Sequence, residues 1–343
     1  MRHCLQLIVH SLENDGVAGG SSGTDRTGVR EHVRPGITRA DEVAANASGE
    51  NFPVALRLLP ERYRRHLTAL YCFARLTDDL GDEARESGQA DADLRLRLLD
   101  ELTADVDRIY QGKTPDSPVM RDMAVTVTEC KIPAQPLRDL IQANRQDQQV
   151  TRYQTFAELA QYCELSANPV GQIVLYIFGA GTPQRITLSD SICTALQLAE
   201  HWQDVAEDLA NGRIYLPAED LARFNVTEAD LAAPSAGPAV RNLMRFETDR
   251  ARGLLDEGAP LVGTLRGAAR LAVAGYLAGG RAALAAIRAQ GYDVLSTTAR
   301  PRKPRMAAEL VKAYAKFLAC DQVIRSHSRY ASVSSTTVPS RRP

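Results

Sequence analysis

Apolar side chains recur every three or four positions through most of this chain, which is the period of an amphipathic α-helix. Stretches in which apolar and polar residues alternate, as they do in a half-buried strand, are hard to find. The breaks between the periodic segments are short and contain proline or glycine. The pattern predicts helices at residues 61–83, 91–111, 118–130, 135–149, 155–180, 188–211, 217–224, 236–256, 260–290 and 303–325. We therefore expect an all-α protein.

The two ends of the chain lack this pattern. Residues 1–47 are rich in polar residues and contain a Gly-Gly-Ser-Ser-Gly run at 19–23, and residues 327–343 are rich in Ser, Thr, Arg and Pro. Segments of this composition bury too little apolar surface to offset the entropy of ordering them. The prediction is a disordered N-terminal arm at 1–47, one all-α domain at 48–326 and a disordered tail at 327–343.

Two acidic segments interrupt the apolar faces of their helices. In the first, Asp78 and Asp82 lie four residues apart. They continue a stripe formed by Leu67, Tyr71 and Ala74, because residues at this spacing share one face of a helix. The stripe thus turns from apolar to charged without leaving the face that packs. Charge at such a place is costly unless a metal ion or a cationic partner compensates it.

The second acidic segment has the same helical spacing. Its stripe runs through an otherwise apolar stretch and consists of Gln197, Glu200, Asp204 and Asp208. Two rows of carboxylates facing each other across a cavity would bind several hard divalent cations, and Mg²⁺ bound in this way keeps positions open for a substrate phosphate. The pair of segments therefore suggests an enzyme that acts on a diphosphate. The alternative is two solvated acidic faces in a chain that is 24% charged.

Composition and charge argue against several other classes of protein. The net charge of −1 gives no reason to expect a nucleic-acid partner. The six cysteines and six histidines lack the spacings of a zinc site or a disulfide framework, which fits a reducing compartment. Arginines interrupt the Ala-rich stretch at 260–290, so it predicts a packed helix and not a membrane span. We expect a cytoplasmic protein and leave open a peripheral contact with the inner face of the membrane.

Four motifs, in order along the chain, resemble the squalene/phytoene synthase family. They are Glu-Asn-Phe-Pro-Val-Ala at 50–55, Tyr-Cys-Phe-Ala-Arg at 71–75, the central motif at 162–171, and the stretch at 197–217 around the second acidic segment. The first and third are most similar to the hopanoid-pathway branch, HpnC, whose members act as hydroxysqualene synthases. The resemblance implies a single-domain, isoprenoid-synthase-type helical bundle with a central cavity between two aspartate-rich helices.

The resemblance also implies roles for individual residues. About three Mg²⁺ ions would grip the diphosphate, and the metal-binding positions would be Asp78, Asp82, Asp204 and Asp208, with Asp79 as a helper. Glu200 lies on the same stripe as Asp204 and is added as a metal ligand on its own chemistry. The substrate-binding positions would be Arg75, Gln197, Arg213 and Tyr215. Tyr71 and Tyr162 would be catalytic, lining a cavity where an aromatic face stabilises a carbocation. The alternative role for either arginine is a surface salt bridge.

Several positions depart from the wider family, among them Asn168 and Pro169 in the central motif, where Gly-Thr or Gly-Leu is common. Glu200 stands where Asn is usual, Gln203 stands where Arg is usual, and Glu50 stands where some relatives have a basic contact with diphosphate. Glu200 can still bind a cation, but the loss of basic residues weakens binding of a second diphosphate. The departures favour a substrate with one diphosphate, presqualene diphosphate, which water converts to hydroxysqualene and diphosphate. Because water capture needs no reductant, we expect no NADPH requirement.

Two other functions stay open on the sequence. One is a head-to-head prenyl synthase of the squalene, dehydrosqualene or phytoene type, with the same fold and metals. The other is a catalytically silent family member that serves as an assembly or binding protein, although buried carboxylates without a metal would destabilise it for no gain. The expected partners are the lipid diphosphate and the enzymes before and after this one in the pathway, with no nucleic acid.

Overall fold

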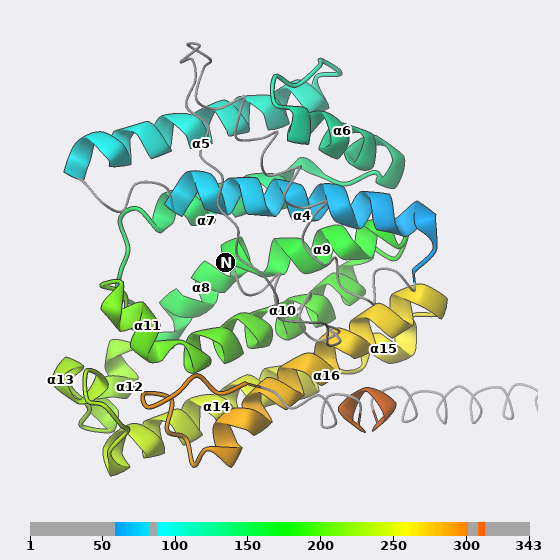
Figure 1. Cartoon of the computed structure of the whole chain (residues 1–343). Helices are drawn as coiled ribbons and strands as arrows, with labels where there is room; N and C mark the ends of the chain where they lie inside the picture. The colour runs from blue at the N-terminus through cyan, green and yellow to red at the C-terminus, as the bar shows by residue number, and fades with distance from the viewer. Residues whose placement is uncertain (1–58, 83–87, 301–307, 313–343) are drawn as a thin grey trace, which may run out of the picture.

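The computed structural model describes residues 59–82, 88–300 and 308–312 (Figure 1). Apart from one isolated parallel bridge between Arg152 and Ile214, these residues form helices and loops only, so the predicted all-α fold is confirmed. The named helices are α4 (Glu61–Asp82), α5 (Gly88–Tyr110), α6 (Pro118–Cys130), α7 (Ala134–Gln146), α8 (Phe156–Ser166), α9 (Asn168–Ile177), α10 (Pro183–Gln203), α11 (Val205–Ala210), α12 (Ala218–Arg223), α13 (Glu228–Leu231), α14 (Pro238–Gly258), α15 (Leu261–Thr264) and α16 (Gly267–Ala289).

The predictions for the two ends of the chain fall largely outside the described residues. This holds for the arm at 1–47 and the tail at 327–343. Of the helix predicted at 303–325, the described part is 308–312, and it is helical. Among the helices that the structure describes, none is both long and apolar enough to span a membrane.

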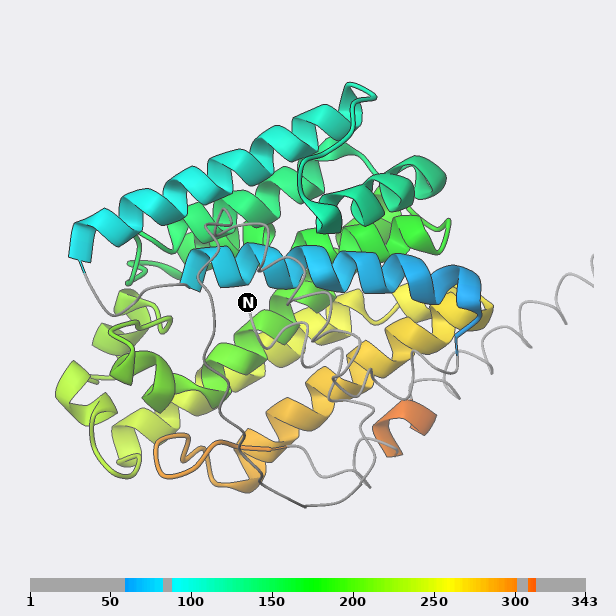
Figure 2. The same cartoon turned by 45° about the horizontal axis from the view of Figure 1, so that its top comes forward.

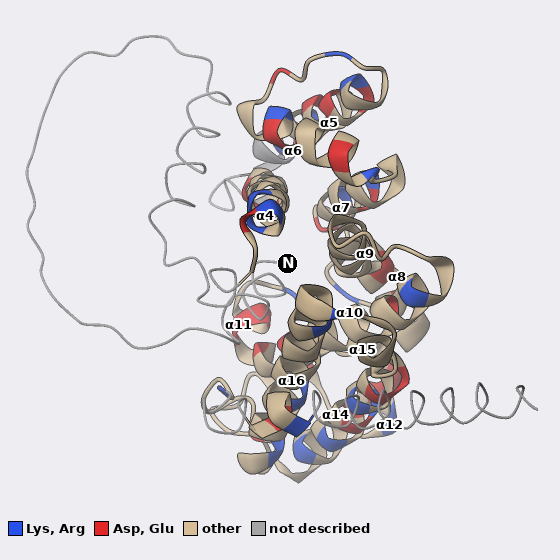
Figure 3. Cartoon of the chain, turned by 90° about the vertical axis from the view of Figure 1, so that its right-hand side faces the viewer, with Lys and Arg blue, Asp and Glu red and all other residues tan. Residues whose placement is uncertain are grey.

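The helices pack as two halves, each with its own apolar core. One core is built by α4, α5, α6, α7 and α9, and its fully buried side chains include Phe73 and Met120. The other lies mainly among α8, α10, α14 and α16 and includes Trp202 and Leu243. Figures 2 and 3 show α4 to α7 on one side of the molecule and α14 to α16 on the other. Helix α10 lies between the halves, because it packs against both α9 and α14.

Local signals explain where α8 and α10 begin. The Thr155 hydroxyl accepts a hydrogen bond from the Glu158 amide at 3.2 Å, and the Thr182 hydroxyl accepts one from the Arg185 amide at 3.4 Å. Such side chains satisfy amides that have no partner within the first turn of a helix. Pro183 follows Thr182 in the first turn, where its missing N–H costs nothing. Helix α10 consequently starts earlier than the hydrophobic pattern predicted.

Three predicted helices are interrupted where the hydrophobic pattern runs on, and the one predicted at 188–211 breaks within the second acidic segment. The segment predicted as 155–180 is divided at Ala167 into α8 and α9. Pro169 in the first turn of α9 lacks an N–H and crowds the preceding turn, which explains the break. The segment predicted as 260–290 is divided into α15 and α16, and the short α13 was not predicted.

Gly258 at the end of α14 allows α14 and α10 to approach closely. A Cβ added there would lie 2.5 Å from Ile192 Cγ1 and 2.6 Å from the backbone oxygen of Leu188. We expect Gly258→Ala to lower the free energy of unfolding by about 1–3 kcal/mol, since a backbone contact must give way. In Gly253→Ala, the matched control in the same helix, the added methyl meets no atom within 4 Å. This control is expected to gain about 0.5–1 kcal/mol. Urea unfolding checks both, and equal effects would contradict the packing argument.

Candidate active site

The first acidic segment lies at the C-terminal end of α4. Asp78 is 2% exposed, and its Oδ1 accepts a hydrogen bond from Asn144 Nδ2 at 3.4 Å. Arg75 Nε donates to both carboxylate oxygens of Asp79, at 3.0 and 3.2 Å. Asp82 is the last residue of α4, and its side chain is not among those that the structure describes. The salt bridge considered as the alternative role of Arg75 is thus present, and it places a cation beside this segment.

The second acidic segment spans the junction of α10 and α11. Gln197 and Glu200 are buried on α10, at 0% and 6% exposed. The helix predicted at 188–211 breaks at Asp204, which has φ −108° and ψ 18°. Hydrogen bonds of helical spacing continue across the break, because the Asp204 amide donates to the Glu200 carbonyl at 3.0 Å and the Asp208 amide to the Asp204 carbonyl at 2.8 Å. The carboxylates therefore remain about one turn apart along the chain.

Both acidic segments lie at the same end of the bundle. In Figure 1, the C-terminal end of α4 and helix α11 both lie toward the left of the bundle. Figure 3 shows α4 and α11 on the same side of the molecule. Burial raises the pKa of Asp204 to about 6, with a contribution from Glu207, and raises the pKa of Asp208 to about 7, with a contribution from Asp204. Half-buried carboxylates that repel one another fit a place where a cation offsets their charge.

The donor set of the two segments fits Mg²⁺. Its members are all carboxylates, which are the hard oxygen ligands that this ion prefers. Within residues 59–82, 88–300 and 308–312, no three or more His, Cys, Asp or Glu side chains gather closely enough to hold an ion by themselves. Mg²⁺ usually takes one or two carboxylates and completes its shell with water and substrate phosphates. The arrangement thus suits an ion that binds together with a diphosphate.

Arg213 and Tyr215 follow α11 and meet Tyr162 of α8 around Asp147, the residue that caps α7. The Tyr162 hydroxyl donates to Asp147 Oδ2 at 2.9 Å, and Arg213 Nη1 donates to Asp147 Oδ1 at 3.2 Å. The rings of Tyr162 and Tyr215 have centroids 5.9 Å apart. Burial, and then Asp147, raise the pKa of Tyr162 well above its ordinary value, so this phenol stays neutral. Tyr71 is not part of this group and packs against the core around α4.

His201 is a further buried residue of this group, and no role was assigned to it from the sequence. Gln197 Nε2 donates to His201 Nε2 at 3.1 Å, and the imidazole stacks on the Tyr215 ring with centroids 3.6 Å apart. His201 Nδ1 lies 3.9 Å from Asp208 Oδ2. The predicted substrate-binding residues Gln197 and Tyr215 are thereby brought together. The only signal in the sequence was that His201 follows Glu200 within the acidic segment.

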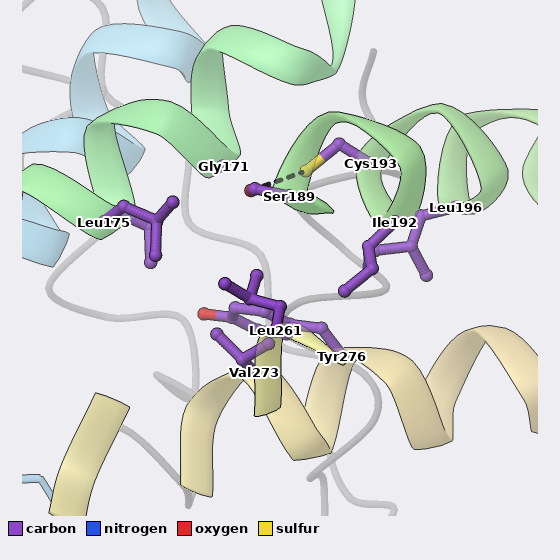
Figure 4. Close-up of a pocket in the computed structure, with 10 residues that line it drawn as sticks. Gly171, Leu175, Ser189, Ile192, Cys193, Leu196, Leu261, Val273 and Tyr276 are labelled. Carbon is purple, nitrogen blue, oxygen red and sulfur yellow. Dashed lines mark hydrogen bonds between the residues drawn. The ribbon is translucent and has the colours of Figure 1, made fainter. Parts of the chain in front are cut away.

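An apolar pocket lies beside α10, where that helix meets α9, α15 and α16 (Figure 4). It is a small cavity of about 20 Å³, and its walls include Val174, Leu175, Ile192, Leu196, Leu261 and Val273. Gly171 leaves room for the Ser189 and Cys193 side chains, since a Cβ added there would lie 2.5 Å and 2.4 Å from their Oγ and Sγ. Because Leu196 precedes Gln197, the pocket and the second acidic segment follow one another along α10. Its lining is apolar, and its volume of about 20 Å³ leaves room for a group the size of a water molecule and not for a prenyl chain.

Known proteins resemble this chain in sequence. The profile of the squalene/phytoene synthase family matches residues 45–307. Phytoene synthase 1, chloroplastic, of Arabidopsis thaliana is 32% identical over 286 residues, which are 81% of this chain and 66% of the relative. Hydroxysqualene synthase of Rhodopseudomonas palustris is 31% identical over 233 residues, 67% of this chain and 77% of that protein.

A solved structure extends the similarity to the fold. The crystal structure of squalene synthase HpnC from Alicyclobacillus acidocaldarius is 40% identical in sequence, with a TM-score of 0.67. The match covers 76% of this chain and 97% of that chain. The family match at 45–307 includes both acidic segments, the Tyr162 group and the residues that line the pocket.

Proposed function

Since the chain belongs to the squalene/phytoene synthase family, whose members act on prenyl diphosphates, we propose that it is a Mg²⁺-dependent hydroxysqualene synthase. The proposed reaction converts presqualene diphosphate and water to hydroxysqualene and diphosphate. Support comes from the similarity to a hydroxysqualene synthase over 67% of this chain and from the 40% identity to the HpnC structure.

The choice of a substrate with one diphosphate rests on Gln203. It stands where an arginine is usual in the wider family, its side chain is buried, and its Nε2 donates to the backbone oxygen of Ala299. A neutral amide bonded to the backbone in this way offers no positive charge to a diphosphate. This favours a substrate that carries one diphosphate over the condensation of two prenyl diphosphates.

The acidic segments and the arginines beside them would bind the diphosphate. The residues proposed to hold Mg²⁺ are Asp78, Asp79, Asp82, Glu200, Asp204 and Asp208. Mg²⁺, when bound, supplies positive charge that stabilises the diphosphate as it leaves. Arg75 and Arg213 lie beside the two segments and are proposed to donate charge-assisted hydrogen bonds to the same group.

The hydrocarbon part of the substrate would lie in a cavity between the two apolar halves of the bundle. Departure of the diphosphate breaks a carbon–oxygen bond and leaves a carbocation, which the aromatic faces of Tyr162 and Tyr215 would stabilise. A water molecule then forms the new carbon–oxygen bond and loses one proton to the released diphosphate. We keep Tyr71 as a proposed wall residue of this cavity, and Gln197 as a contact to substrate.

The proposal is tested by the product formed from presqualene diphosphate. Purified protein with Mg²⁺ and no nicotinamide cofactor is expected to release hydroxysqualene. Squalene that forms only when NADPH is added, with no alcohol in its absence, would assign the reductive reaction instead.

A second candidate, a head-to-head synthase, is favoured by the 32% identity to a phytoene synthase. It predicts product from farnesyl or geranylgeranyl diphosphate alone, whereas our proposal predicts none.

A further inference from the structure

The end of α7 lies between the two acidic segments. This end, residues 144–148, is called the α7 terminus below. Asn144 and Asp147 are three residues apart, which makes them neighbours on the surface of a helix. Asn144 contacts α4, whereas Asp147 contacts Tyr162 and the loop after α11. The sequence predicted a helix here and assigned no function to either residue.

The contact of the α7 terminus with the first acidic segment is close. Asn144 Nδ2 donates to Asp78 Oδ1 at 3.4 Å. A Cβ added at Gly81 would lie 2.4 Å from Asn144 Oδ1, so only glycine lets this amide sit against α4. Gln148 Nε2 donates to the Gly81 carbonyl at 2.8 Å. The position of Asp78 therefore depends on where the α7 terminus lies.

The contact with the second acidic segment runs through Arg213. This guanidinium donates to Asp147 Oδ1 at 3.2 Å and to the Asp147 backbone oxygen at 2.6 Å. The Arg213 amide donates in turn to the Asp208 carbonyl at 2.8 Å. Both charged side chains are largely buried, at 13% and 17% exposed, so water competes little for this pair. Hydrogen bonds thus connect the α7 terminus to both acidic segments.

We propose that Asp147 is a positioning residue and that the α7 terminus sets the separation of the two acidic segments. Mg²⁺ demands near-ideal octahedral geometry with short bonds, so carboxylates on two helices must be held at the right distance before the ion and the diphosphate bind. In other metal sites, mutation of a residue that hydrogen-bonds to a metal ligand lowers the metal affinity by about 10–100-fold. The inference rests on the proposed function only in that both segments bind Mg²⁺ and diphosphate.

The test compares Asp147→Asn with Asp139→Asn. The first variant keeps the shape of the side chain and an oxygen that can accept from Tyr162, but it removes the charge that pairs with Arg213. The control makes the same change on the same helix, where Asp139 accepts a hydrogen bond from Gln135. Thermal unfolding is followed while Mg²⁺ is titrated at a fixed concentration of inorganic pyrophosphate. We expect the half-stabilising Mg²⁺ concentration to rise about tenfold or more in Asp147→Asn and to stay at the wild-type value in Asp139→Asn.

A purely structural role would lower the melting temperature without ions and leave the Mg²⁺ midpoint unchanged, and that result overturns the inference. If Asp147→Asn does not fold, Asn144→Ala tests the other contact of the α7 terminus. Its half-stabilising Mg²⁺ concentration is also expected to rise about tenfold or more, and an unchanged Mg²⁺ midpoint would overturn the inference. A wild-type protein that Mg²⁺ and pyrophosphate fail to stabilise would overturn the metal site, and the inference with it. A shifted midpoint in Asp147→Asn, together with no alcohol from presqualene diphosphate, would support the inference and refute the proposed function.

Discussion

Removal of divalent cations is expected to abolish turnover of presqualene diphosphate, and Mg²⁺ alone is expected to restore it. Asp78 is buried beside α7, and burial with like charge raises the pKa values of Asp204 and Asp208. These carboxylates stabilise a diphosphate only if cations lie between them and the phosphate oxygens. The measurement is product formation after treatment with EDTA and after gel filtration into buffer with Mg²⁺.

Ca²⁺ serves as the matched control for the ion. It prefers six to eight oxygen ligands at longer distances than Mg²⁺ accepts, so it is expected to restore much less activity at the same concentration. Full activity after complete chelation would contradict the metal-dependent mechanism.

The second large effect is expected from the second acidic segment. Asp204→Asn should lower kcat by about 10²–10³-fold, which is typical for loss of one group that stabilises developing charge. Glu200→Gln should mainly raise the Mg²⁺ requirement, because Asp204 and Asp208 retain part of the binding. Glu200 is 6% exposed, so it is not a solvated surface residue. Steady-state kinetics at several Mg²⁺ concentrations measure both effects.

An exposed aspartate on α14 provides the control for these variants. Asp249 forms an i,i+3 salt bridge with Arg252, and Asp249→Asn is expected to leave kcat and the Mg²⁺ requirement unchanged. A Glu200→Gln enzyme with wild-type Mg²⁺ dependence, beside an inactive Asp204→Asn, would remove Glu200 from the metal site. An active Asp204→Asn enzyme would contradict the assignment of the segment.

The fold was predictable because hydrophobic periodicity depends on local sequence. The breaks were harder, since they depend on single residues within continuous apolar patterns. Pro169 is a local signal for a break, because the residue before a proline disfavours the helical conformation. The continuous apolar pattern around it predicted one helix instead. Asp204 carries no such signal, since its φ and ψ depart from helical values while the hydrogen bonds on both sides continue.

The site was predictable only where its residues belong to motifs. The acidic segments have a spacing that can be read from the chain, and the Arg75–Asp79 pair has the i,i+4 spacing of a helical salt bridge. Asp78, which accepts from Asn144, and Arg213, which pairs with Asp147, each lie 66 residues away along the chain. Contacts between such distant positions are set by helix packing, and the amphipathic pattern of α7 does not encode them.

The source of the product's oxygen is the most direct test of the central claim. Presqualene diphosphate is incubated with the protein and Mg²⁺ in ¹⁸O water, without NADPH, and the product is analysed by mass spectrometry. Capture of the carbocation by water predicts an alcohol that carries one ¹⁸O atom, released together with diphosphate. An unlabelled alcohol, or a hydrocarbon as the sole product, would contradict the assignment of this protein as a hydroxysqualene synthase.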